Sequence, residues 1–165
     1  MRKIYLVLLT FSLVFLFQSC VLVDPFLNDT EIHNKLVIKL DDLCEKEALF
    51  NNEYKTVFDT EDIDLVILRF EDFKASFIVL DNYFKDSWFE SSQNIFVSEY
   101  NDYYHDFMVS YLDSAELFVN SLNKDGLNVA NLESILDELD RYTLLFYDYH
   151  NRLSDTVNSQ VLEIE

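Results

Sequence analysis

The chain has 165 residues, and its 50% hydrophobic content is high enough for a packed core rather than a disordered polymer. It contains one glycine and one proline, and because tight turns depend on these residues, the composition disfavours a sheet protein and favours long helices. The 31 acidic residues outnumber the 12 basic ones, for a formal net charge of −19. Such a field repels nucleic acid and anionic lipid headgroups, so we expect neither as a partner of the domain surface.

The first twenty residues, MRKIYLVLLTFSLVFLFQSC, have the three parts of a secretory signal peptide. A basic start at Arg2 and Lys3 is followed by an apolar segment and a short polar stretch that ends at Cys20. The last four residues, FQSC, resemble the lipobox of bacterial lipoproteins, in which a large apolar residue and then a small one precede the cysteine. This resemblance implies a signal peptide over residues 1–19 and a lipidated Cys20 at the head of a tether, residues 20–29.

The leader has an alternative interpretation as an uncleaved signal anchor. The almost continuous apolar stretch from Ile4 to Val23 is about long enough to cross a hydrocarbon core of ~30 Å. In either case the rest of the chain lies outside the cytoplasm. We therefore expect a domain held to the cell membrane or the outer membrane that faces the periplasm or the exterior.

Residues 30–165 are predicted to form an acidic helical domain, and two helices account for its first half. The first runs from about Thr30 to Phe58, and the second is expected to follow Thr60 as its N-cap. Apolar residues recur at steps of three and four along both helices, as they do where helices pack lengthwise. The first stripe comprises Ile32, Leu36, Leu40, Leu43, Phe50, Tyr54 and Val57, and the second comprises Ile63, Val66, Phe70, Phe73, Phe77, Leu80 and Phe84. Leu65, Ile67, Leu68 and Ile78 widen the second stripe.

Two further helices are predicted in the second half. The third begins after a cap at Ser91-Ser92 and closes at Asp125-Gly126, where glycine suits a left-handed residue. The fourth is capped by Asn128 or Asn131. The third stripe comprises Val97, Tyr100, Tyr104, Phe107, Tyr111, Ala115, Phe118 and Leu122, and the fourth comprises Leu132, Ile135, Leu139, Tyr142, Phe146, Tyr149, Leu153 and Val157.

Four long helices with short connections predict an all-α, up-and-down four-helix bundle. An extended helical coiled coil is the alternative, but the apolar faces are wider than a coiled-coil seam and favour the closed bundle.

No pattern in the sequence points to catalysis, so we expect a non-enzymatic protein without catalytic residues, cofactor or bound metal. One glycine is too few for a phosphate-binding loop or a nucleophile elbow, and neither H-E-x-x-H nor C-x-x-C occurs. Asp102 and His105 lie one helical turn apart and could form a surface metal site, yet both fall off the apolar stripe. They are expected, like His150 and His33, to face water. Cys44 could form an intermolecular disulfide or be a small buried apolar residue.

The aromatic residues beyond the stripes suggest a binding surface. Tyr103 and Tyr147 lie beside their stripes, and Trp88 and Phe89 follow the second helix. Aromatic side chains with a polar tip suit interfaces, so these four are candidate partner-binding residues, with core packing as the alternative. We expect a membrane-anchored interaction module for a cationic envelope or secreted protein. A structural surface-coat lipoprotein without a specific ligand is the alternative.

Overall fold

A computed structural model describes residues 29–85, 99–125 and 129–159, and nearly all of these residues are helical. The elements are α2 (Asp29–Thr60), α3 (Ile63–Phe84), a short π-helix η1 (Tyr100–Tyr104), α6 (His105–Asp125) and α7 (Val129–Ser159). The prediction of an all-α protein is therefore confirmed. The leader with Cys20, the predicted Ser91-Ser92 cap, Gly126, Trp88 and Phe89 lie outside the described residues.

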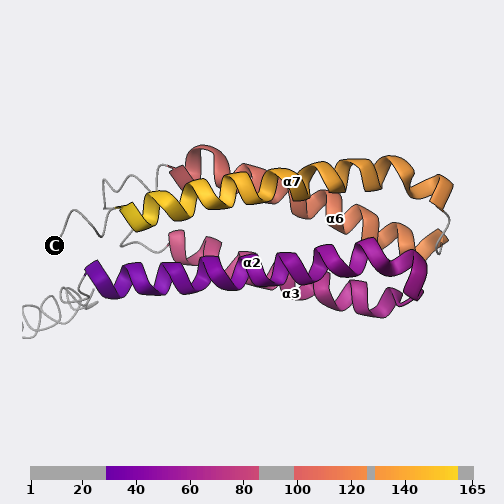
Figure 1. Cartoon of the computed structure of the whole chain (residues 1–165), viewed down its shortest axis with the longest axis horizontal. Helices are drawn as coiled ribbons and strands as arrows, with labels where there is room; N and C mark the ends of the chain where they lie inside the picture. Colours follow the sequence, from indigo (N-terminus) through magenta and orange to yellow (C-terminus); the bar gives the residue numbers. More distant parts are fainter. Residues whose placement is uncertain (1–28, 86–98, 126–128, 160–165) are drawn as a thin grey trace, which may run out of the picture.

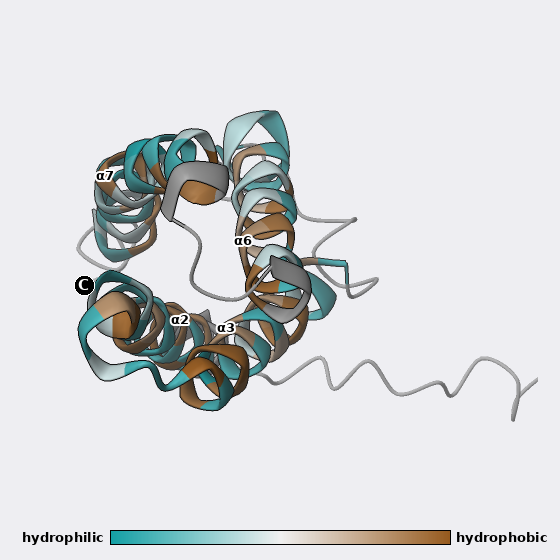
Figure 2. Ribbon diagram, turned by 90° about the vertical axis from the view of Figure 1, so that its right-hand side faces the viewer, coloured by the Kyte–Doolittle hydropathy of each residue, from teal (hydrophilic) through white to brown (hydrophobic). Residues whose placement is uncertain are grey.

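The long helices lie side by side as a closed bundle (Figures 1 and 2). Each packs on two neighbours: α2 on α3 and α7, and α6 on the same two helices. The contact between α2 and α7 closes the ring, so a closed bundle forms rather than an extended coiled coil. The start of α2 and the end of α7 lie at the same end of the molecule (Figure 1). Among the described helices, none is both long and apolar enough to cross a membrane.

The core consists of the predicted apolar stripes. In α2, α3 and α6, every stripe residue whose side chain is described is buried, apart from Ile63, which is half-buried. Aromatic rings fill the centre, where the Phe73 ring packs edge-on against Tyr111 and Phe146, with centroid distances of 5.3 and 6.2 Å. Each ring pair adds about 0.5–1.5 kcal/mol to the stabilisation from area burial. The periodicity of the sequence therefore determines the core.

The predicted register of α7 is wrong by one residue at two positions. Tyr142 and Tyr149 were expected on the seam, but Thr143 and His150 occupy it and are almost fully buried. The tyrosines lie to one side and stack on α6, with Tyr149 on Phe107 at a centroid distance of 4.5 Å. The small threonine and the polar histidine are preferred at the seam because tyrosine hydroxyls from other helices end there and need partners.

The junction between α2 and α3 is a tight turn of two residues. Glu61 adopts a left-handed backbone with φ of 57°, and its N–H donates to the Val57 carbonyl, which ends α2. The N-cap of α3 is Asp62, whose carboxylate accepts from the Leu65 N–H at 3.0 Å. Thr60 was predicted as this cap; instead its hydroxyl accepts from the Asp62 N–H. Because Glu61 takes the left-handed position, the first residue able to cap α3 is Asp62.

A π-turn begins the described part of the third helix. The His105 N–H donates to the Tyr100 carbonyl five residues earlier, so one extra residue is accommodated in the turn. Tyr100 and Tyr104 are both buried there, and the Tyr100 ring stacks on Phe84 at a centroid distance of 3.9 Å. Through this stacking, the π-turn packs against the end of α3 just before α6 begins.

Candidate functional site

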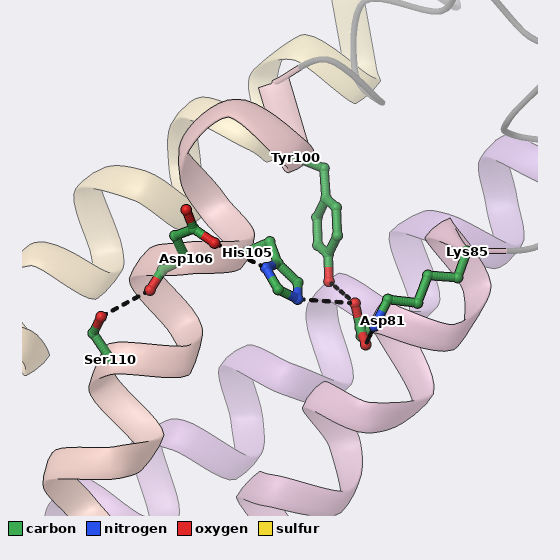
Figure 3. A network of polar contacts seen from close by, with 6 residues as sticks. All are labelled: Asp81, Lys85, Tyr100, His105, Asp106 and Ser110. Atoms are coloured by element: carbon green, nitrogen blue, oxygen red, sulfur yellow. Dashed lines mark hydrogen bonds and ion pairs between the residues drawn. The ribbon is translucent and has the colours of Figure 1, made fainter.

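Three features of the described surface and core could carry a function: a polar cluster around Asp81, a buried network around Glu47 and an exposed apolar strip on α3. The Asp81 cluster lies where the end of α3 meets η1 and α6 (Figure 3). Asp81 Oδ1 accepts from the Tyr100 hydroxyl at 3.0 Å and lies 3.5 Å from His105 Nε2. Lys85 forms an ion pair with the other oxygen.

The Asp81 cluster corrects the prediction for His105. This side chain was expected to face water, but it is about one-third exposed and packs near the Phe77 ring. Its two nitrogens face Asp81 and Asp106 (Figure 3). Within the part of the chain that the structure describes, no group of three or more histidine, cysteine, aspartate or glutamate side chains could hold a metal ion. Through Asp81, the cluster connects α3 with Tyr100 of η1 and His105 of α6.

The second feature is a hydrogen-bonded network through the bundle centre. Glu47 on α2 is fully buried, and its Oε1 accepts from the Tyr111 hydroxyl of α6 at 2.8 Å. Tyr111 also lies 2.8 Å from the Thr143 hydroxyl of α7, which is 3.1 Å from the Tyr54 hydroxyl. Tyr54 donates to the Asp140 carboxylate at 2.7 Å. We call these five residues the Glu47 network; it links three helices and reaches the surface at Asp140, whose side chain is 55% exposed.

Burial is the main influence on the Glu47 carboxyl. It raises the pKa of Glu47, while the hydroxyls of Tyr111 and Tyr147 and the charge of Lys55 act in the opposite direction. Oε2 is buried and forms no hydrogen bond of normal geometry with a described residue. Burial therefore opposes the charged form of Glu47, whereas Tyr111, Tyr147 and Lys55 favour it.

The sequence offered a signal for Glu47 that the stripe analysis missed. The α2 stripe steps from Leu43 to Phe50, and Glu47 occupies the skipped position between them. A strict alternation of steps of four and three would have assigned Glu47 to the core.

His150 on α7 was expected to face water, and this prediction is wrong. Its side chain is buried, Nδ1 lies 3.0 Å from the Tyr104 hydroxyl, and the ring stacks on Phe146. Burial lowers the pKa of His150 from 6.5 to about 4, with Asp41 opposing the shift. The imidazole is therefore neutral at physiological pH and serves as a hydrogen-bond partner within the core.

The two described candidates for partner binding have different neighbours: Tyr103 of η1 packs on α7, and Tyr147 of α7 faces α2. Tyr103 is half-buried against Tyr149, and the Arg152 guanidinium lies 4.2 Å from its ring centroid. Tyr147 is 36% exposed, and its hydroxyl lies near Glu47 and Asn51 of α2. The structure does not bring Tyr103 and Tyr147 together.

Cys44, one turn before Glu47, is a partly buried free thiol that packs against the core. Burial raises its pKa, and Glu47 and Asp41 add to the shift. A thiol with a raised pKa is a weak nucleophile at neutral pH.

The third feature is a run of exposed apolar residues on the outer face of α3, which we call the α3 strip: Leu68, Ala75, Ile78 and Val79. Leu68 is 53% and Val79 is 50% exposed. Leu68 and Ile78 were expected to widen the buried face, and this expectation is wrong: the core uses the opposite side of α3, where Phe73 and Phe77 lie.

Acidic residues share the outer face of α3 with the strip. Asp64 and Glu71 are exposed and lie three or four residues from Leu68, so they belong to the same face. The two basic residues of α3 are already engaged, Arg69 with Asp72 at 3.6 Å and Lys74 with Glu116 at 3.2 Å. The face is therefore apolar and anionic together.

Comparisons of this chain with protein-family models, with curated proteins and with solved structures found no match.

Proposed function

We propose that this chain is a membrane-anchored lipoprotein of the cell envelope, lipidated at Cys20, that binds a cationic protein and catalyses no reaction. The partner we propose is a helical segment with an apolar stripe and flanking lysine or arginine residues, docking on the α3 strip. The observation that supports the proposal is the α3 strip, because its apolar side chains are exposed on a face of α3 that does not contribute to the core of the bundle.

The spacing of the exposed residues on α3 supports a helical partner. Asp64, Leu68, Glu71, Ala75 and Ile78 follow one another at steps of four and three. This is the spacing at which one helix presents a continuous seam to another. A helix laid along α3 would bury the strip and exclude water from it.

The charge of the domain supports a cationic partner. Its formal charge is strongly negative, so a second copy of the chain would be repelled, whereas a basic segment would be attracted at long range. Within α3 the arginine and the lysine are already paired, so charges complementary to Asp64 and Glu71 would come from the partner. Trp88 and Phe89 remain candidate contacts because they follow α3 closely in the sequence.

Differential affinity capture tests the proposal. The full-length protein, extracted from the envelope in detergent, is compared with the double variant Leu68→Ser/Val79→Ser and with Ile38→Ser. Ile38 is the matched control because it is 66% exposed on α2. We expect wild type and Ile38→Ser to retain the same basic protein and the double variant to lose it at unchanged melting temperature. Equal retention by all three proteins, or no retained protein, would favour the surface-coat alternative.

A further inference from the structure

A second exposed apolar position with acidic neighbours lies on α7. Leu144 is 75% exposed, the largest fraction for any large apolar side chain among the described residues, and Tyr147, three residues later, is 36% exposed. Asp140 lies four residues before Leu144 and Asp148 lies four residues after it, and both are exposed. Residues three and four apart share one side of a helix, so these four side chains form one surface, which we call the α7 face.

The cations beside the α7 face already have partners. Lys55 Nζ of α2 lies 3.9 Å from Asp140 Oδ1. Arg141 lies 3.8 Å from the Glu138 carboxylate, and its guanidinium is 4.9 Å from the Tyr142 ring centroid. The helix as a whole carries more acidic than basic residues. A segment with an apolar stripe and lysine or arginine at its sides would therefore complement the α7 face in shape of contact and in charge.

The α7 face repeats the arrangement on α3 at the opposite corner of the bundle. On α3, the exposed Leu68 lies four residues after Asp64 and three before Glu71, both also exposed. Each of these two helices packs on α2 and α6, so α3 and α7 lie diagonally across the ring (Figure 2). A helix docked on one face is separated from a helix on the other by the bundle itself, and the two do not compete for space.

We propose that the α7 face is a second docking site for a basic helical segment, and that the chain bridges two basic proteins, one on α3 and one on α7. The apolar residues of the α3 strip are aliphatic, whereas the α7 face pairs a leucine with a tyrosine, so each face selects its own segment. The α7 site is supported by its own residues. The bridging role rests on the proposed function of the α3 strip.

Counting bound peptide tests the α7 face. The probe is a synthetic amphipathic helix of leucine and lysine, titrated into the full-length protein in detergent, with protein-free detergent as the blank. At saturation we expect wild type to bind about twice as much peptide as Leu144→Ser, because the variant keeps only one of two sites. The variant should melt at the wild-type temperature, since the side chain is exposed.

Leu117→Ser is the matched control. This α6 side chain is 52% exposed, and Asp113 lies one turn before it, but only uncharged residues lie one turn after it. We expect Leu117→Ser to bind as much peptide as wild type. A loss equal to that of Leu144→Ser would overturn the proposal, because any exposed leucine would then serve.

The α3 variant Leu68→Ser/Val79→Ser separates this inference from the proposed function. It should also halve the bound peptide, and adding Leu144→Ser should remove saturable binding although every charge is kept. If the α3 variant binds less and Leu144→Ser binds as much as wild type, the α7 site is overturned and the proposed function stands. If only Leu144→Ser binds less, the α7 site is supported and docking on α3 is contradicted. Equal binding by all variants would overturn both.

Discussion

At the scale of single residues, the core of this bundle is specified by polar side chains as well as apolar ones. Tyr54, Tyr104 and Tyr111 are fully buried, and each hydroxyl finds a partner on another helix. A one-residue shift of α7 would separate Thr143 and His150 from these hydroxyls, and unsatisfied buried groups cost about 1–3 kcal/mol each. The polar positions thus fix a register that apolar packing alone would specify less strictly.

His150 predicts a loss of stability in acid. Its folded pKa is about 4 against an ordinary value of 6.5, so the unfolded chain binds more protons than the folded one between these values. The free energy of unfolding should therefore fall as pH drops from 6.5 through about 4, by up to about 3 kcal/mol. His150→Gln, which can still bond to Tyr104, should remove this component. Thermal melts of both proteins across that range check it, and equal slopes would show that His150 does not titrate with the fold.

Glu47 and His150 act in opposite directions as pH falls. Because the folded pKa of Glu47 is raised, its contribution to stability is fully present below its unfolded pKa and is lost as pH rises through the folded value. The two contributions therefore oppose each other in mild acid, and the single variants Glu47→Gln and His150→Gln separate them.

At the scale of the helices, the sequence predicts the number of described long helices and nearly all of their buried apolar faces. Strict steps of three and four suffice for this because a helix has one face that can reach the core. The predicted register is wrong where a contact with another helix, rather than the apolar pattern, determines which residue is buried. Thr143 and His150 replace tyrosines on the α7 seam because tyrosine hydroxyls from α2, η1 and α6 end there. The π-turn at Tyr100 coincides with stacking of this ring on Phe84, a contact between elements that periodicity within one helix cannot show.

Truncation of central aromatic residues tests the helical register. Phe73 and Phe146 are completely buried, so replacing either with alanine should cost about 3–5 kcal/mol, measured by chemical denaturation. Leu144→Ala is the matched control, because its side chain is 75% exposed on the same helix as Phe146 and should change stability by less than about 0.5 kcal/mol. A Phe146→Ala variant as stable as Leu144→Ala would mean that α7 faces the core differently.

At the scale of the whole molecule, an acidic bundle presents one face of α3 that is apolar as well as charged. The sequence alone could not locate this face, since Leu68 and Ile78 are as apolar as the residues of the core. Only the packing of α3 between α2 and α6 shows which of its sides is left uncovered. Of the binding residues named from aromatic content, Tyr103 on η1 packs against Tyr149 of α7, whereas the Tyr147 hydroxyl of α7 faces α2.

The proposed anchor predicts a distinct biochemical phenotype for Cys20. If the leader is a lipoprotein signal, Cys20→Ser should abolish labelling with a radioactive or alkyne fatty acid and leave an unprocessed precursor. Cys44→Ser is the control, since it leaves the leader intact and should label normally. A wild type that never incorporates label would favour the signal anchor.

Site-specific photo-crosslinking in living cells tests the central claim most directly. A photoreactive amino acid is placed at Val79 in the α3 strip and, as a control, at Ile38 on α2, which is at least as exposed. The proposed function predicts a discrete adduct with one basic protein from Val79 and none from Ile38, and the adduct should weaken at high salt because screening reduces the attraction of opposite charges. Equal, diffuse labelling from both positions, or an adduct from Ile38 alone, would contradict a docking role for the α3 strip.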